Sequence, residues 1–220
     1  MWCEFFAAFP DHLQPLVSSV QETVLASKAE GTIPTYPYLS DLGTVALCLL
    51  GYAGFFRFSE LCSRACDIKF FPTYVSIFLE SSKTDQFRDR AWVAIARPNQ
   101  DTCPVKALEQ YIAAAKIDLG EDLPLFRALS SSRSTSKVRR QGLSYSRARE
   151  IVKDAFKVIT DVSCISLHSL RAGGATAAVN VGSHDRLFKR HGRWLSENAK
   201  DGYVKDNFQS LLSVSKSLGI

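Results

Sequence analysis

The sequence lacks the features that mark membrane and secreted proteins. Its longest apolar run, residues 45–56, is interrupted by two glycines and closed by Arg57, so it is too short to span a membrane. The N-terminus carries no basic residue ahead of an apolar stretch, and a secretory signal is therefore not expected.

Metal-ligand and nucleotide-binding motifs are also missing. The six cysteines show no repeated metal-ligand spacing, which indicates reduced thiols in an intracellular protein rather than disulfides. A zinc site could be drawn from one cysteine and three histidines, but no second spacing supports it, and we predict no metal. There is no glycine-rich phosphate loop with its lysine and no paired acidic cluster of a two-metal nuclease. The sequence therefore predicts chemistry without ATP or another cofactor.

Positive charge is present, and it is concentrated in one part of the chain. The 220 residues carry a net charge of +5, yet residues 127–205 hold sixteen Lys and Arg against six Asp and Glu. Such asymmetry is typical of a surface that binds a polyanion. A basic face that is only solvated is the alternative interpretation.

Apolar periodicity predicts a mainly α fold with a small antiparallel β-sheet, which is an α+β class. Helices with one buried stripe are expected from Asp41, from Pro104 and from Ser144. A further helix is expected around residues 16–29. A chain of this length can bury a sizeable core and is most simply one domain with short appendages.

Two short stretches show the alternation of β-strands. Residues 75–79 and 91–97 alternate apolar with other side chains and are predicted to pair as a hairpin, whose turn carries Lys83. The segment 130–140, rich in serine and basic residues, is instead predicted to be a flexible loop.

Residues 166–204 gather the side chains that can perform chemistry on a phosphate. His168 and Arg171 are three positions apart, so on a helix they share a face and can hold one anion together. Trp194 is followed nine residues later by Tyr203, which comes directly after an Asp-Gly pair that breaks a helix. A phenol beside a bound phosphate can act as its nucleophile.

Two further basic residues fit such a site. Arg57 stands among three phenylalanines, where it could bind phosphate with Glu60 as its orienting partner, and Ser59 could cap the helix that follows. A surface arginine covering aromatic faces is the alternative. Lys83 at a hairpin tip could reach over a substrate, although a simple charged turn would look the same.

These residues, in this order, resemble the pattern of the tyrosine recombinase (integrase) family. The pattern joins an arginine with a following acidic residue, a hairpin lysine, H-x-x-R, a His or Trp, and a tyrosine nine residues later. The phrases GFFRFSEL, SSKTDQFR, TCPV and HSLRAGGATAA are most similar to the eukaryotic branch of DIRS-like and Crypton-like mobile elements. The resemblance covers residues 35–215.

The resemblance implies a DNA strand transferase that breaks and rejoins DNA through a 3′-phosphotyrosyl intermediate, with chemistry similar to that of type IB topoisomerases. Tyr203 would be the nucleophile, His168 the proton acceptor, and Lys83 the proton donor to the leaving 5′-oxygen. The remaining residues of the set would be Arg57, Arg171 and Trp194 on the phosphate and Glu60 behind them. A truncated or domesticated DNA-binding module that keeps the fold without efficient catalysis is the alternative.

The resemblance also implies how the chain is divided. Residues 39–205 would form the catalytic domain, residues 1–38 a remnant of the linker to an N-terminal DNA-binding domain, and residues 206–220 an amphipathic tail. Because too little chain precedes the catalytic domain, we expect a fragment or a protein that has lost half of its DNA clamp. The tail would pack on its own domain or dock into a neighbouring protomer, giving a homo-oligomer on double-stranded DNA. A nuclear location is expected.

Basic residues outside the catalytic set are expected to contact DNA phosphates. They fall in the predicted loop, on the outer face of the helix after Ser144, and next to Trp194. The predicted DNA-contacting residues are Arg133, Lys137, Arg139, Arg140, Arg147, Lys153, Lys189, Arg190 and Arg193.

Overall fold

The computed structural model describes most of the chain in a few continuous stretches. The described residues are 9, 12, 14–19, 22, 36–80, 91–132, 135–157, 161–206, 212–213 and 215–218; for 36–37, 131–132, 135–136 and 164 the backbone alone is described. Within these stretches no helix is both long enough and apolar enough to cross a membrane. The predicted helix at 16–29 is described only at its start, where residues 14–19 are helical.

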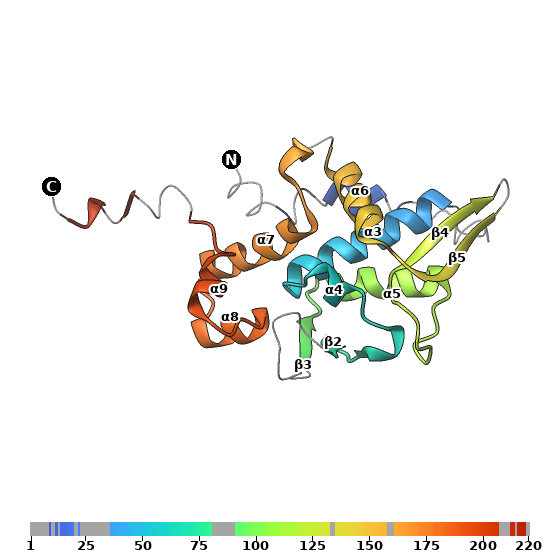
Figure 1. The fold of residues 1–220 in the computed structure, drawn as a ribbon, viewed down its shortest axis with the longest axis horizontal. Helices are drawn as coiled ribbons and strands as arrows, with labels where there is room; N and C mark the ends of the chain where they lie inside the picture. The colour runs from blue at the N-terminus through green and yellow to red at the C-terminus, as the bar shows by residue number, and fades with distance from the viewer. Residues whose placement is uncertain are drawn as a thin grey trace.

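A single central helix, α3 (Tyr36–Ala53), organises the core. It packs against α5 (Pro104–Ala115) and α7 (Leu167–Asn180), as Figure 1 shows. The prediction of one buried stripe on this helix is wrong, because Leu47 and Cys48, which lie off that stripe, are also buried. The helix is surrounded by other elements, and its apolar residues are therefore spread around its circumference.

A three-stranded antiparallel sheet lies against one side of these helices. Its strands are β1 (Ile68–Phe70), β2 (Tyr74–Leu79) and β3 (Ala91–Ala96), in the order β1-β2-β3, preceded by the 3-10 turn Ala65–Asp67. Val75 pairs with Ile95 and Ile77 with Val93, and all four side chains are buried. The predicted hairpin is confirmed, while its turn at 81–90, including Lys83, lies outside the described residues.

The segment predicted to be a flexible loop forms a second hairpin instead. Strands β4 (Arg127–Ser132) and β5 (Thr135–Gly142) pair antiparallel, with Leu129 opposite Val138. Both of these side chains pack against the core, and this anchors strands whose other residues are mostly polar. A composition rich in serine and arginine hid this pairing, because only two apolar side chains carry it.

The helix after this hairpin begins where the sequence predicts, at Ser144. In α6 (Tyr145–Phe156) the hydroxyl of Ser144 caps the N-terminus by accepting a hydrogen bond from the Arg147 N–H at 3.2 Å. Ala148, Val152 and Phe156 are buried on its inner face. The charged side chains of α6 are thereby left on the outer face.

The last helices form a separate end of the molecule. Figure 1 shows α7, α8 (Asp185–Gly192) and α9 (Glu197–Asp201) together at one end, opposite the β4–β5 hairpin. The 3-10 turn Val162–Cys164 leads into α7. A small second core holds this end together, formed by Phe55, Ala175, Phe188 and Trp194.

Gly174 explains how α7 approaches α3 so closely. A side chain here would collide with the carbonyl oxygen of Tyr52, so the close approach of the two backbones requires a glycine at this position. The helix continues through Gly173 and Gly174 to Asn180.

Candidate active site

The turn after α3 presents the first arginine of the candidate site. The short helix α4 (Phe58–Leu61) starts at Arg57, which is its N-cap, so the expected capping role of Ser59 is wrong. The Glu60 carboxylate reaches back and accepts a hydrogen bond from the Arg57 N–H at 2.7 Å and another from its guanidinium at 3.2 Å. Glu60 thus fixes both the backbone and the side chain of Arg57, as the sequence predicts.

Glu60 is the centre of a buried charge cluster. Its side chain is 1% exposed, and one carboxylate oxygen lies 2.9 Å from Nη2 of Arg193 and 3.7 Å from Nη1 of Arg171. Burial alone would raise the pKa of Glu60, but the charges of Arg193 and Arg171 and the hydrogen bond from the Arg57 N–H together hold that pKa below its ordinary value. The carboxylate is therefore ionised and balances three guanidinium groups that converge from distant parts of the chain.

Arg171 lies at the bottom of this cluster and has no exposed surface. Its Nη2 donates to the carbonyl oxygen of Gly192 at 2.6 Å, and its Nη1 donates to that of Phe55. Burial lowers the pKa of Arg171 to about 10, and the neighbouring arginines add to the effect. The group stays positively charged at neutral pH.

Two aromatic rings cover the Arg171 guanidinium. Its carbon lies 4.9 Å from the centre of the Trp194 ring and 4.6 Å from that of Tyr203, and the two rings are 5.6 Å apart. The indole Nε1 of Trp194 is buried and has no hydrogen-bond partner among the described residues. A buried donor without an acceptor fits a site that receives an anionic oxygen from a ligand.

Tyr203 is held just beyond the end of α9. Ser196 caps α9 through a hydrogen bond from the Ala199 N–H at 3.2 Å, and the helix ends at Asp201, so the predicted break at the Asp-Gly pair is confirmed. The hydroxyl of Thr176 on α7 donates to the Tyr203 carbonyl at 3.4 Å and accepts from the N–H of Lys205 at 3.2 Å. The structure therefore presents the phenol over the arginine cluster.

The two histidines near the site lie in different surroundings. His168 is exposed on α7, with its ring nearly parallel to that of Tyr203 at 6.5 Å between centres. His191, which the sequence interpretation did not place in the site, lies with Nε2 2.8 Å from the carbonyl oxygen of Ala53. Burial lowers the pKa of His191, so its ring is neutral at pH 7.

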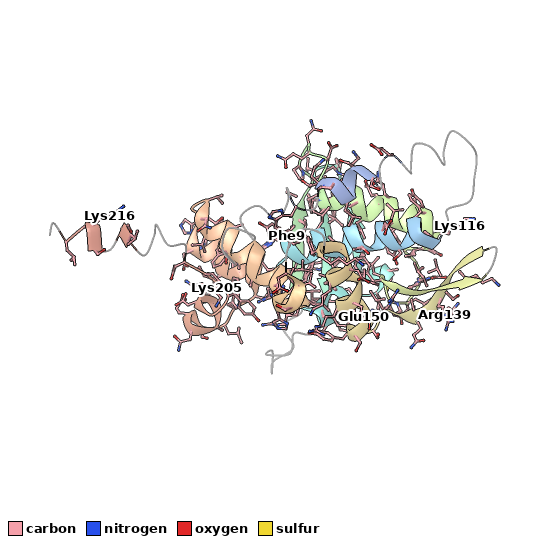
Figure 2. The ribbon with its side chains drawn as sticks, turned by 90° about the horizontal axis from the view of Figure 1, so that it is seen from above. Phe9, Lys116, Arg139, Glu150, Lys205 and Lys216 are labelled. Carbon is pink, nitrogen blue, oxygen red and sulfur yellow. The ribbon has the colours of Figure 1, made fainter. Side chains whose placement is uncertain are left out.

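The predicted DNA-contacting residues fall into two groups. Most lie on the outside, and Figure 2 shows Arg139 on the β4–β5 hairpin along the same edge of the view as Glu150 of α6. Arg193, in contrast, turns inward onto Glu60, and Lys189 lies 2.5 Å from a Glu197 oxygen. The exposed residues are Lys137, Arg139, Arg140, Arg147 and Arg190, and Lys153 and Lys189 are half-exposed, whereas Arg133 and Lys83 lie outside the described residues.

No cluster of three or more His, Cys, Asp or Glu side chains suited to a metal ion occurs in the described part of the chain. Of the tail, Leu218 is exposed and Leu212 half-buried, while Phe208 and Leu211 lie outside the described residues.

This chain is similar in sequence to a curated protein. The chain is 34% identical over 170 residues to the "Integrase/recombinase xerD homolog" of Selenomonas ruminantium, a match that covers 76% of this chain and 48% of the relative. The chain thus spans about half the length of the curated relative that it matches. No protein-family model matches the sequence.

Solved structures with the same fold include two recombinases. The XerH site-specific recombinase, bound to palindromic difH substrate in a post-cleavage complex, gives a TM-score of 0.62 at 12% identity, covering 96% of this chain and 52% of that one. The XerA recombinase gives a TM-score of 0.57 at 20% identity, covering 94% of this chain and 62% of that one. The predicted tyrosine recombinase catalytic-domain fold is thereby confirmed. In sequence this chain is thus similar to a XerD-like integrase/recombinase, and in fold it is similar to the catalytic domains of tyrosine recombinases.

Proposed function

We propose that this chain is the catalytic domain of a site-specific tyrosine recombinase that cleaves double-stranded DNA through Tyr203. The observation that carries the proposal is the convergence of four side chains from separate segments. Arg57 and Arg171 both lie on the buried Glu60 carboxylate, and the rings of Trp194 and Tyr203 cover the Arg171 guanidinium. A phenol above clustered guanidinium groups is the arrangement that phosphodiester cleavage by tyrosine requires.

In the proposed reaction the Tyr203 oxygen attacks phosphorus while the bond from phosphorus to the 5′-oxygen breaks. The phenolic proton passes to a base, for which exposed His168 beside the ring is the candidate. Lys83 would protonate the leaving 5′-oxygen. The product is a 3′-phosphotyrosyl ester, and a DNA hydroxyl reverses the step without ATP.

Two groups would stabilise the negative charge that develops on the phosphate oxygens. Arg57, half-buried at the start of α4, would donate forked hydrogen bonds. Trp194 would supply its indole N–H, for which the described residues offer no acceptor. Removal of one such donor from an oxyanion site costs about 10²- to 10³-fold in rate.

The amino-acid sequences of the motifs support a more specific proposal. The phrases GFFRFSEL and HSLRAGGATAA favour a mobile element of the DIRS-like or Crypton-like kind, and a eukaryotic element of this kind would act in the nucleus. We further propose that two or more copies assemble on DNA, with the tail of one copy docked on the next.

A DNA-binding module without efficient catalysis is the second candidate. It is favoured by Arg171, which has no exposed surface and donates both of its Nη groups to backbone carbonyls. This module would bind duplex DNA as tightly as an active domain but form no covalent product.

Covalent trapping distinguishes the two candidates. On a nicked duplex that loses its leaving strand, the wild-type chain is expected to accumulate a protein–DNA adduct in chelator and without ATP. Tyr203→Phe removes the attacking oxygen and should form no adduct at unchanged DNA affinity. Tyr74→Phe is the matched control, since Tyr74 stacks on Phe71 away from the site. Binding without any wild-type adduct would favour the DNA-binding module, and an adduct with Tyr203→Phe would refute the choice of nucleophile.

A further inference from the structure

Arg193 adopts an unfavourable backbone conformation, whose cost must be offset by the contacts of its side chain. It ends α8 with φ of 56°, in the left-handed region that favours glycine. Trp194 follows at once, and a side chain at Gly192 would collide with the Trp194 ring. The chain thus turns sharply at Arg193 to bring the indole into the site.

The Arg193 guanidinium is fully engaged with protein acceptors. Nη1 donates to the carbonyl oxygens of Gly54 at 3.1 Å and His191 at 2.6 Å. Nη2 donates to the carbonyl of Phe55 at 2.8 Å and to Glu60 at 2.9 Å. The side chain is 9% exposed, so this basic residue is not part of the outer surface.

These hydrogen bonds join two segments that carry different parts of the site. One is the loop of residues 54–57, which leads into Arg57. The other is the turn of residues 192–194, which ends at Trp194. Glu60 is shared between them, because the carboxylate that receives Arg193 also holds Arg57.

We infer that Arg193 is a positioning residue for strand cleavage: it fixes Arg57 and Trp194 relative to one another through the 54–57 loop and Glu60. The inference rests on the proposed function. It replaces the sequence-based expectation that Arg193 contacts DNA phosphate with a role inside the protein. Its guanidinium acts only through the residues that it holds.

Two substitutions distinguish the role of the Arg193 side chain from that of its backbone conformation. Arg193→Gly relaxes the left-handed conformation but removes every hydrogen bond of the guanidinium, whereas Arg193→Lys keeps the charge without the planar fork. Adduct formation by Arg193→Gly is expected to be about 100-fold slower in single turnover, because groups misplaced by about 1 Å lose that much. Arg193→Lys should be slowed less, and DNA affinity should stay at the wild-type value in both.

The control for charge is Arg186→Gln, which removes an exposed arginine from the same helix and should leave the cleavage rate unchanged. Millimolar ethylguanidinium should partly restore cleavage by Arg193→Gly. Cleavage by Arg193→Gly at the wild-type rate would overturn the inference, as would a loss of DNA affinity equal to the loss of rate.

A readout without DNA keeps the inference separate from the proposed function. Amide hydrogen exchange in residues 54–57 and 192–194 should become faster in Arg193→Gly and stay unchanged in Arg186→Gln. Unchanged exchange in Arg193→Gly would refute the positioning role, even if the wild-type chain cleaves DNA. A wild-type chain that forms no adduct would refute the proposed function alone.

Discussion

The guanidinium carbon of Arg171 lies 4.6 Å from the centre of the Tyr203 ring. The ring and not the hydroxyl makes this contact, so Tyr203 has a structural role that is separable from its proposed chemical one. Tyr203→Ala should lower the free energy of unfolding by about 1 to 2 kcal/mol, because it removes the cation–π interaction and part of the apolar burial. Tyr203→Phe should lose much less. Denaturant unfolding of both variants measures the difference, and equal losses would show that the hydroxyl matters to folding.

Glu60 should be the residue of the cluster most costly to neutralise. Glu60→Gln keeps the shape but leaves three guanidinium groups around a neutral amide, and it should lower the free energy of unfolding by about 3 to 5 kcal/mol. Glu109→Gln is the control, since Glu109 pairs with Arg97 in a more exposed position and its loss should be much smaller. Similar losses in the two variants would mean that the Glu60 cluster does not stabilise the fold.

The half-buried ring of His191 predicts how stability depends on pH. Its pKa is lowered from an ordinary value of 6.5, chiefly by burial, with Arg193 and Arg171 adding to the effect. Below pH 6.5 the unfolded chain therefore binds a proton that the folded chain does not bind. The free energy of unfolding should fall as the pH is lowered from 6.5 towards the pKa of His191 in the folded state, and it should rise when the pH is raised again.

Unfolding at about pH 7.5 and about pH 5.5 tests this dependence. His191→Gln should lose less stability than the wild type between these two values, because glutamine can bond to the Ala53 carbonyl and does not titrate. His184→Gln, which alters an exposed ring at the start of α8, should behave as the wild type. A wild-type pH dependence in His191→Gln would assign the effect to other groups.

The β4–β5 hairpin should supply part of the DNA affinity. A triple change of Lys137, Arg139 and Arg140 to glutamine should reduce the slope of log affinity against log salt by about 0.9 for each phosphate that the variant no longer neutralises. Binding to duplex DNA between low and moderate salt measures this slope. The matched control removes the same charge elsewhere, at Lys69, Lys106 and Lys116. Equal effects of the two triple variants would indicate that net charge alone, and not the hairpin, governs binding.

Much of the helical fold and the β2–β3 pairing could be predicted from the sequence. The strand alternation at 75–79 and the caps at Ser144 and Ser196 each depend on neighbours within a few residues. The β4–β5 hairpin could not be predicted in this way, because it is anchored by Leu129 and Val138 against a core built from distant segments.

For the candidate site, too, the sequence predicted some residues and missed a contact that depends on distant parts of the chain. The family pattern selected Arg57, Arg171, Trp194 and Tyr203, and the structure brings these four side chains together. It did not reveal that Arg193 points inward, since an arginine in a basic run is ordinarily solvated. One feature of the sequence could have indicated it. Arg193 stands directly between Gly192, which ends a helix, and Trp194, and a turn at such a place has to bury one of its side chains.

The complete burial of Arg171 has a consequence for measured affinities. A phosphate can touch this guanidinium only in conformers where the Trp194 and Tyr203 rings have moved aside. If such conformers are a fraction of the population, the apparent dissociation constant of any complex that uses Arg171 is the intrinsic one divided by that fraction. Substitutions that loosen the attachment of Tyr203 to Thr176 would then strengthen DNA binding while they weaken the fold, so affinity and stability would change in opposite directions.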